Sequence, residues 1–398
     1  MVYELLKERP NARILVCAPS NVATDALALA LLKIEAETKK QIELVRLYAS
    51  YIEKEPMGQV PSELYCYSIH NMHDEKKKKW EVEMQLLQKA DVVCCTCTVA
   101  GDARLRKLKF DVVIIDECSV AMDPEVLLPL VKTKSKNAKI CIFGDRKQLE
   151  PIVASKINTA LGFNKSFFKR MFGLYQFVRE YPALNVQYRM HPSISDFPRN
   201  YFYDGQVMDG VEVSQIMELA HGKDNLLFPN NEIWIAFCNY DKGCHETRVD
   251  MPVAKYGNAK RPSYCNVSEV AITHKVAQLM IEMGVDSDEI GVIAMYKAQV
   301  TALLQYFDNP PTSAASDRNV LEAVKCVSIG TVDSFQGREK SFIIVSCVRC
   351  NKNGKIGFLR HPGRLNVALT RARYGLVIVG NIETLKSRNP MFQSEHGC

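Results

Sequence analysis

Residues 112–117 read Val112-Val113-Ile114-Ile115-Asp116-Glu117, a β-branched apolar run that ends in two carboxylates. Four such residues without a polar break predict a strand buried on both faces, as in parallel sheets that are covered by helices. Open α/β folds bind their ligands at the carboxyl ends of the strands. An Asp at that edge can hold the magnesium ion of a nucleoside triphosphate, and a neighbouring Glu can polarise the attacking water. The stretch therefore indicates one half of a nucleotide-hydrolysis site.

The other half of such a site is a Gly-x-x-x-x-Gly-Lys-Ser/Thr loop, whose backbone N–H groups and lysine cradle the phosphates. The sequence does not contain this motif. Its two Gly-Lys pairs, Gly222-Lys223 and Gly354-Lys355, lack the upstream glycine and the following hydroxyl residue. We therefore expect the nucleotide site of this chain to be incomplete.

Composition and charge exclude few classes of protein. The chain has 398 residues, of which 47% are hydrophobic, enough for a sizeable core and two or three domains. Its net charge of +6 tolerates an anionic partner but does not by itself indicate nucleic acid. No run approaches the 18 apolar residues of a membrane span, and the amino terminus lacks a secretory pattern. We expect no membrane contact and a cytoplasmic location, with the nucleus as a second one.

The 14 cysteines lie largely in apolar strand-like runs, and we interpret them as buried or half-buried reduced thiols. Cys347 and Cys350 form a Cys-x-x-Cys pair, but no second pair follows at zinc spacing. Magnesium is therefore the only metal that we expect.

Short apolar strands alternate with helical patterns along the chain. In the first half the predicted strands are 14–17, 92–95, 112–115 and 140–143, with a helix over about 22–33. In the second half they are 233–237, 290–294, 324–329, 342–347 and 376–379, with helices over about 268–283, capped by Ser268, and 297–307. This alternation predicts an α/β protein with two doubly wound parallel sheets. The boundary is expected near residues 180–186, and residues 35–89 are expected to form an insertion.

Further polar residues follow the predicted strands. Gln148 follows the strand at 140–143, where its amide can hydrogen-bond a terminal phosphate. Ser20 and Asn21 stand at the start of the helix after the first strand. There they can cap the helix or contact a phosphate, and both roles can coexist.

Three motif-like clusters lie in the second half, at 187–192, 331–339 and 364–373. Together with Cys17-Ala18-Pro19-Ser20-Asn21 they closely resemble superfamily 1 helicases of the up-frameshift-like branch, which contains the RNA helicase of nonsense-mediated mRNA decay. The resemblance runs along the whole chain. It implies two RecA-like domains, residues 1–182 with motifs Ia to III and residues 183–398 with motifs IV to VI.

The resemblance implies a role for five residues in hydrolysis. Asp116 would hold Mg²⁺ through its water shell, and Glu117 would orient and deprotonate the attacking water. Gln148 would sense the γ-phosphate of ATP. Arg189 and Arg371 would reach that phosphate from the second domain, with Arg371 as the arginine finger.

The resemblance also implies binding residues for ATP and for a single strand of nucleic acid. Tyr188 would stack on the base, and Glu339 beside Gly337 would bind the ribose. The strand would be held by hydroxyl and amide side chains, namely those of Ser20, Asn21, Thr96, Thr98, Thr331 and Ser334.

The activity implied is ATP-dependent translocation along a single strand, RNA rather than DNA, with 5′ to 3′ polarity by analogy. An arginine finger contributes roughly 10³ to 10⁵ in rate and acts only when two domains close on the nucleotide. Closure and opening would therefore move a strand held across both domains. ATP and Mg²⁺ are the cofactors expected.

The chain departs from the family at its amino terminus, because residues 1–8 align with the latter part of the helix that follows the phosphate loop. The first domain is therefore expected to be incomplete. Poor ATP binding, turnover below a helicase-like rate and a tendency to associate follow as expectations. The alternatives are a shortened, catalytically inactive nucleic-acid-binding protein and a DNA-directed relative. A reading frame that encodes the missing loop upstream of Met1 would argue against the first alternative. Affinities measured for matched RNA and DNA strands would distinguish an RNA helicase from the DNA-directed relative.

Overall fold

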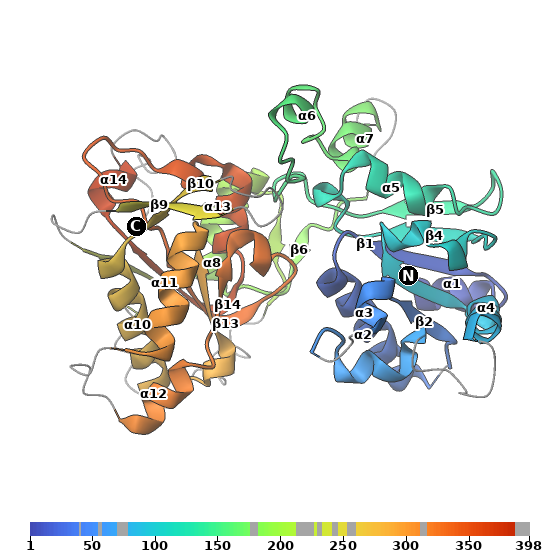
Figure 1. The fold of residues 1–398 in the computed structure, drawn as a ribbon, viewed down its shortest axis with the longest axis horizontal. Coiled ribbons are helices and arrows are strands. Elements are labelled where there is room, and N and C mark those ends of the chain that lie inside the picture. The colour runs from blue at the N-terminus through green and yellow to red at the C-terminus, as the bar shows by residue number, and fades with distance from the viewer. Residues whose placement is uncertain are drawn as a thin grey trace. The chain divides into compact units, whose positions relative to one another are not determined.

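The computed structural model describes residues 1–39, 41–54, 58–69, 79–175, 182–211, 227–228, 233–240, 246–252, 260–310 and 317–386. The chain divides into two compact units, Met1–Tyr181 and Pro182–Cys398 (Figure 1). Each unit is built around a five-stranded parallel sheet with helices on both faces. The predicted α/β class with two doubly wound sheets is confirmed.

The sheet of the first unit has the order β2-β3-β1-β4-β5. These strands are β1 Ile14–Ala18, β2 Leu44–Leu47, β3 Val92–Thr96, β4 Val112–Ile115 and β5 Lys139–Ile142. Alternate strand residues point into two separate cores, as a sheet covered on both faces requires. One core includes residues of α1 Val2–Glu8, α2 Asn21–Thr38 and the 3₁₀ helix η1 Ser62–Tyr67. The other includes residues of α4 Lys79–Lys89 and α5 Asp123–Leu130.

Strand β2 lies inside residues 35–89, the stretch interpreted as an insertion, and it pairs with β3 in the sheet. The sequence pattern missed it because Arg46 interrupts the apolar run. Arg46 is fully buried, and its guanidinium donates to Asp25 Oδ1 at 2.8 Å and to Asn21 Oδ1 at 2.9 Å. It also lies over the ring of Tyr48, 3.8 Å from the centroid. A charged residue enters a core only with such partners, which sequence spacing does not reveal.

Strand β5 forms one edge of this sheet among the described residues. Its side chains are less buried than those of the other four strands, and Ile140 is 48% exposed. Beside it, Leu127 of α5 and Val131 at the end of that helix are 50% and 60% exposed. A free edge with apolar side chains favours association with other chains.

The sheet of the second unit has the order β12-β11-β13-β14-β8. Its strands are β8 Ile235–Asn239, β11 Ile290–Ala294, β12 Ser328–Thr331, β13 Lys340–Ser346 and β14 Ala372–Gly380. The helices of this unit are α8 Pro192–Tyr203, α10 Val267–Glu282, α11 Lys297–Asp308, α12 Arg318–Val324, α13 Pro362–Leu369 and α14 Ile382–Lys386. Two small sheets accompany them. β6 Val186–Gln187 pairs in parallel with β7 Met208–Asp209, and β9 Thr247–Pro252 pairs in antiparallel fashion with β10 Lys260–Cys265.

Two local predictions for the second unit are wrong. Helix α10 is capped by Asn266, whose Oδ1 accepts the Glu269 N–H at 3.2 Å, and not by Ser268. The strand expected from Val324 begins only at Ser328, because Val324 is the last residue of α12. No helix among the described residues is long and apolar enough to cross a bilayer.

Candidate functional site

The two acidic residues stand at the carboxyl edge of the first sheet, as predicted. The N–H of Asp116 donates to the carbonyl oxygen of Cys17 at 2.8 Å, which extends the β1–β4 pairing by one residue. Glu117 has a left-handed backbone with φ of 51°, an uncommon conformation for a residue with a side chain. Its N–H donates to Asp116 Oδ1 at 2.8 Å. This turn holds both carboxylates at the strand end, half-buried.

The loop after β5 lies beside this acidic turn. The Cys118 N–H donates to the carbonyl oxygen of Phe143 at 2.9 Å, which joins the chain after β4 to the end of β5. Gln148 belongs to the same loop, and its Nε2 donates to Asp145 Oδ2 at 2.9 Å. The residue is half-buried. The structure thus places the glutamine on the neighbouring strand end, as the sequence predicts.

Ser20 and Asn21 follow β1 at the same edge. Ser20 caps α2, because its Oγ accepts the Ala23 N–H at 3.2 Å. Asn21 is held by Arg46, which contacts its side-chain oxygen. An arginine can only donate, so this contact assigns the acceptor atom of Asn21 and leaves its Nδ2 as the donor. The capping interpretation of Ser20 is confirmed, and its contact with a strand stays a prediction.

Thr96 and Thr98 follow β3, whose last residue pairs with Ala18 of β1. The Oγ1 of Thr96 accepts the Val99 N–H at 3.3 Å, and the residue is buried. Thr98 is exposed. Of these two residues, only Thr98 presents its side chain freely at the edge.

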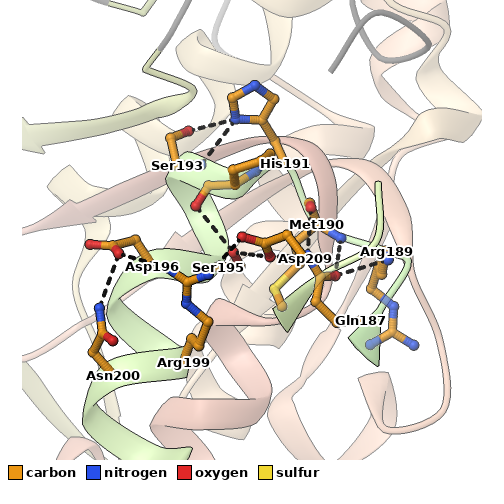
Figure 2. A network of polar contacts seen from close by, with 11 residues as sticks. Gln187, Arg189, Met190, His191, Ser193, Ser195, Asp196, Arg199, Asn200 and Asp209 are labelled. Atoms are coloured by element: carbon orange, nitrogen blue, oxygen red, sulfur yellow. Dashed lines mark hydrogen bonds and ion pairs between the residues drawn. The ribbon is translucent and has the colours of Figure 1, made fainter. Parts of the chain in front are cut away.

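In the second unit, Tyr188 and Arg189 follow β6 directly, and Figure 2 shows Arg189 on this turn. Tyr188 is 74% exposed, so its ring is available for stacking. Arg189 Nε donates to Glu339 Oε2 at 2.5 Å, and its Nη1 donates to the carbonyl oxygen of Thr370 at 3.2 Å. Arg373 Nε lies 3.9 Å from Glu339 Oε1. Residues far apart in the sequence thus gather around one carboxylate.

Backbone hydrogen bonds hold these segments together. The His191 N–H donates to the carbonyl oxygen of Arg373 at 2.8 Å, and the Lys340 N–H donates to that of Arg371 at 3.1 Å. Burial lowers the pKa of His191, an effect that the nearby carboxylate of Asp209 opposes. A neutral imidazole therefore lies behind the turn at physiological pH.

Arg371 is only 3% exposed, unlike the other arginines of this cluster. Its Nε donates to the carbonyl oxygen of Val367 at 3.1 Å, and its Nη2 donates to Thr370 Oγ1 at 3.0 Å. The guanidinium is thus folded onto the end of α13. Arg373, to which no role was assigned from the sequence, is the more exposed of the two. In the sequence, the feature that could have pointed to Arg373 is its position two residues after Arg371 in the same motif-like cluster.

The remaining predicted residues of this unit lie around β12 and the start of β13. Thr331 caps the 3₁₀ helix η7 Val332–Phe335, because its Oγ1 accepts the Ser334 N–H at 3.4 Å. Ser334 is exposed and donates to the carbonyl oxygen of Thr331 at 2.8 Å. Gly337 has a φ of +73°, a conformation that favours glycine and turns the chain toward Glu339.

Comparisons with known proteins place this arrangement in a family. Two family models, both described as AAA domain, match residues 66–156 and 163–383. A Neurospora crassa regulator of nonsense transcripts 1 homolog is 37% identical over 97% of this chain and 34% of its own length. The Saccharomyces cerevisiae ATP-dependent helicase NAM7 is 36% identical over 100% of this chain and 40% of its own length. The chain belongs to the up-frameshift-like branch of the superfamily 1 helicases.

A third relative, the ATP-dependent helicase upf1 of Schizosaccharomyces pombe, is 35% identical over 95% of this chain. The chain spans from 34% to 40% of the length of these three helicase-family relatives. A solved complex of arterivirus nonstructural protein 10 (helicase) with DNA is 12% identical, with a TM-score of 0.36. That similarity is too weak to bear on fold or function.

The residues at the acidic edge of this helicase-family chain are compatible with a magnesium ion, which they would hold through few protein ligands. The described residues contain no group of three or more carboxylate, imidazole or thiol side chains that could form a protein cage for a metal. Mg²⁺ needs no such cage, because it is commonly bound through one or two carboxylates and substrate phosphates. Asp116, whose Oδ1 accepts the Glu117 N–H, would present Oδ2 toward such an ion.

Proposed function

We propose that this chain forms the motor of an ATP-dependent helicase that translocates along single-stranded nucleic acid, RNA in preference to DNA, from 5′ to 3′. The supporting observation is the division of chemistry between the units. The acids and the glutamine stand at one sheet edge of the first unit, while an exposed tyrosine and arginines gather around Glu339 in the second. Hydrolysis that needs both sets is coupled to domain movement.

The roles proposed in hydrolysis are those that the family resemblance implies. Asp116 holds Mg²⁺ through water, and Glu117 orients and deprotonates the attacking water. When bound, Mg²⁺ neutralises charge that develops on the phosphate oxygens. Gln148 senses the γ-phosphate. Arg189 and Arg371 stabilise the charge on it in the transition state, and Arg371 must leave its contacts on α13 to do so.

In the proposed nucleotide site, Tyr188 stacks on the base and Glu339 beside Gly337 binds the ribose. In this structure Arg189 is paired with the Glu339 carboxylate. In the proposal, a ribose that binds this carboxylate displaces the arginine, which then turns toward the phosphate. Replacing the arginine by a ribose as the partner of a half-exposed carboxylate costs little free energy, because a solvent-exposed ion pair is weak. The nucleotide can therefore free the arginine that it requires.

In the proposed strand site, hydroxyl and amide groups contact phosphates without reading the bases. The donors are Ser20, Asn21, Thr96, Thr98, Thr331 and Ser334. Ser20, Thr98 and Ser334 are the exposed residues among those with hydroxyl groups. The preference for RNA is supported by the relatives that are named regulators of nonsense transcripts.

The second candidate function is nucleic-acid binding without hydrolysis. This function needs the strand contacts but gives no reason for Asp116, Glu117, Gln148, Arg189 and Arg371 to be present together.

The two candidates are separated by the affinity of residues 1–398 for a fluorescent single-stranded RNA, measured by anisotropy without nucleotide, with ADP and Mg²⁺, and with AMP-PNP and Mg²⁺. Because weak nucleotide binding is expected, each nucleotide is added at a saturating concentration. The motor predicts that the nucleotide states differ by at least about fivefold in RNA affinity. Arg189→Ala and Arg371→Ala should remove this difference and leave the nucleotide-free affinity unchanged. RNA binding that is indifferent to nucleotide would favour the second candidate.

Two further measurements complete the test. A DNA strand of matched sequence should bind more weakly than the RNA, and equal affinities would contradict the RNA preference. Turnover of ATP at a helicase-like rate by residues 1–398, abolished by Glu117→Gln, would overturn the expectation that the nucleotide site is incomplete.

A further inference from the structure

The turn that carries Tyr188 and Arg189 rests on strand β7, whose residues drew no attention in the sequence. Gln187 of β6 pairs with Asp209 of β7, and the Gly210 N–H donates to the carbonyl oxygen of Gln187 at 2.8 Å. Figure 2 shows the side chains of Gln187, Asp209, Ser195 and Arg199 close together. This two-stranded sheet therefore adjoins the proposed nucleotide-binding turn directly.

Gln187 clamps the backbone of the turn. Its Oε1 accepts the N–H groups of Arg189 at 2.9 Å and Met190 at 2.7 Å. Its Nε2 donates to the carbonyl oxygen of Met190 at 2.8 Å and to Asp209 Oδ1 at 2.6 Å. A backbone N–H can only donate, so these contacts also assign the orientation of the amide. All four of these hydrogen bonds join the Gln187 side chain to the turn or to β7.

Asp209 anchors this amide to the rest of the unit. Besides Gln187, Oδ1 accepts the Ser195 hydroxyl at 2.6 Å, and Oδ2 accepts Arg199 Nη1 at 3.0 Å. The carboxylate is 15% exposed, and Arg199 compensates its charge. A carboxylate with donors on several sides is held in one orientation. Helix α8 therefore fixes Asp209, and Asp209 fixes Gln187.

Gly210 lies against the ring of Tyr188. A Cβ atom at this position would be 2.4 Å from Tyr188 Cε1 and 2.6 Å from Val186 Cγ1, distances that no real Cβ adopts. The ring can therefore lie where it does only because residue 210 has no side chain. Since Tyr188 remains 74% exposed, its position on Gly210 leaves most of the ring open.

We propose that Asp209 and Gly210 are positioning residues for the nucleotide site, an inference that rests on the proposed roles of Tyr188 and Arg189. Asp209 holds the backbone of the turn through Gln187, and Gly210 sets the place of the tyrosine ring. Neither residue touches the nucleotide. A ring and an arginine that are held in place before binding lose less freedom when the ligand arrives.

The test uses residues 1–398 with 3-fluorotyrosine incorporated at position 188, so that ¹⁹F NMR reports the surroundings of the ring without any nucleotide. Gly210→Ala and Asp209→Ala should each shift this resonance. Asp209→Asn, which keeps an oxygen for Gln187, should restore it. Asp196→Ala is the matched control, because Asp196 also contacts Arg199, at 3.4 Å, but does not touch Gln187.

Calorimetric titration with ADP and with AMP-PNP, each with Mg²⁺, then tests whether the position of the Tyr188 ring and of the turn affects nucleotide affinity. Gly210→Ala should weaken both nucleotides about tenfold, within the range for the loss of one aromatic stack on a base. Asp209→Ala should weaken AMP-PNP about fivefold, the size of one lost hydrogen bond. The nucleotide affinities of Asp209→Asn and Asp196→Ala should stay within about twofold of that of the parent chain, because both variants keep an acceptor for Gln187 at position 209.

The outcomes distinguish this inference from the proposed function. An unchanged ¹⁹F resonance in both Gly210→Ala and Asp209→Ala would overturn the positioning role, whatever the nucleotide does. Equal losses in Asp209→Asn and Asp209→Ala would show that only the ion pair with Arg199 matters, and would also overturn it. Tyr188→Ala without loss of nucleotide affinity, or no nucleotide binding by the parent chain, would instead overturn the proposed nucleotide site and with it the role of its supports.

Discussion

Arg189 Nε lies 2.5 Å from Glu339 Oε2, although the two residues are 150 positions apart in the chain. Both side chains are partly exposed, and Arg373 reaches the other oxygen of the same carboxylate at 3.9 Å. A pair in contact with water contributes little to stability. Its importance is therefore expected in ligand binding, where the arginine and the carboxylate take different partners.

Arg189→Ala should lower the free energy of unfolding by less than about 1 kcal/mol, because the pair is screened by solvent. It should nevertheless weaken AMP-PNP more than ADP, since only the former carries a γ-phosphate. Urea unfolding and calorimetric titration measure the two effects. Lys325→Ala is the matched control, because it breaks the exposed pair of Lys325 with Glu322 on α12. A large loss of stability in Arg189→Ala alone would contradict this expectation.

Substitutions at Ser20 should separate helix capping from strand binding. Ser20→Ala removes the cap of α2 and should cost about 1 kcal/mol of stability. Ser20→Asp keeps an acceptor at the helix start and should retain the stability, but its charge should repel the phosphates of a strand. Thermal unfolding and RNA anisotropy measure these effects. Ala36→Asp, which adds the same charge near the exposed far end of α2, should leave RNA affinity unchanged.

Arg46→Met should destabilise the first unit by about 3 to 5 kcal/mol, because it leaves the buried carboxylate of Asp25 without its cation. The double variant Arg46→Met with Asp25→Asn should recover part of this loss, since no unpaired charge remains. Chemical denaturation of the single and double variants tests the difference. Additive costs in the double variant would show that the two side chains do not depend on each other.

Glu269 should make the stability of the second unit depend on pH. It is fully buried on α10, where its carboxylate accepts the Ser346 hydroxyl, the Val348 N–H and the Tyr240 hydroxyl, each at 2.7 Å. Burial raises its pKa from 4.5 to about 7, and these hydrogen bonds oppose the rise only in part. Between these two values the folded state binds more protons than the unfolded state.

The free energy of unfolding should therefore fall as the pH rises from about 4.5 to about 7, by about 3 kcal/mol, and level off above that range. Urea unfolding followed by Trp234 fluorescence, in a chain with Trp80→Phe, reports on the second unit. Glu269→Gln cannot titrate and should flatten this part of the profile. Parallel profiles for the parent chain and Glu269→Gln would contradict the prediction.

Local patterns predicted most strands of both sheets because these strands are continuous apolar runs. Strand β4, with its two carboxylates, is the clearest example. The edge strand β2 escaped because Arg46 is neutralised by residues from another element, and such compensation is a property of the folded chain. The cap of α10 was misassigned by two residues for a similar reason, since a serine and an asparagine both suit a helix start.

The sequence by itself determined the fold class, the family resemblance and the acids and glutamine at the strand ends, because these depend on residue order and on strands that run to one edge. Only the tertiary structure decided which distant residues meet. It placed Arg189 on Glu339, folded Arg371 onto the end of α13, and set Asp209 and Gly210 behind the turn of Tyr188. These contacts join segments through packing and hydrogen-bond geometry, which the spacing of residues along a chain does not specify.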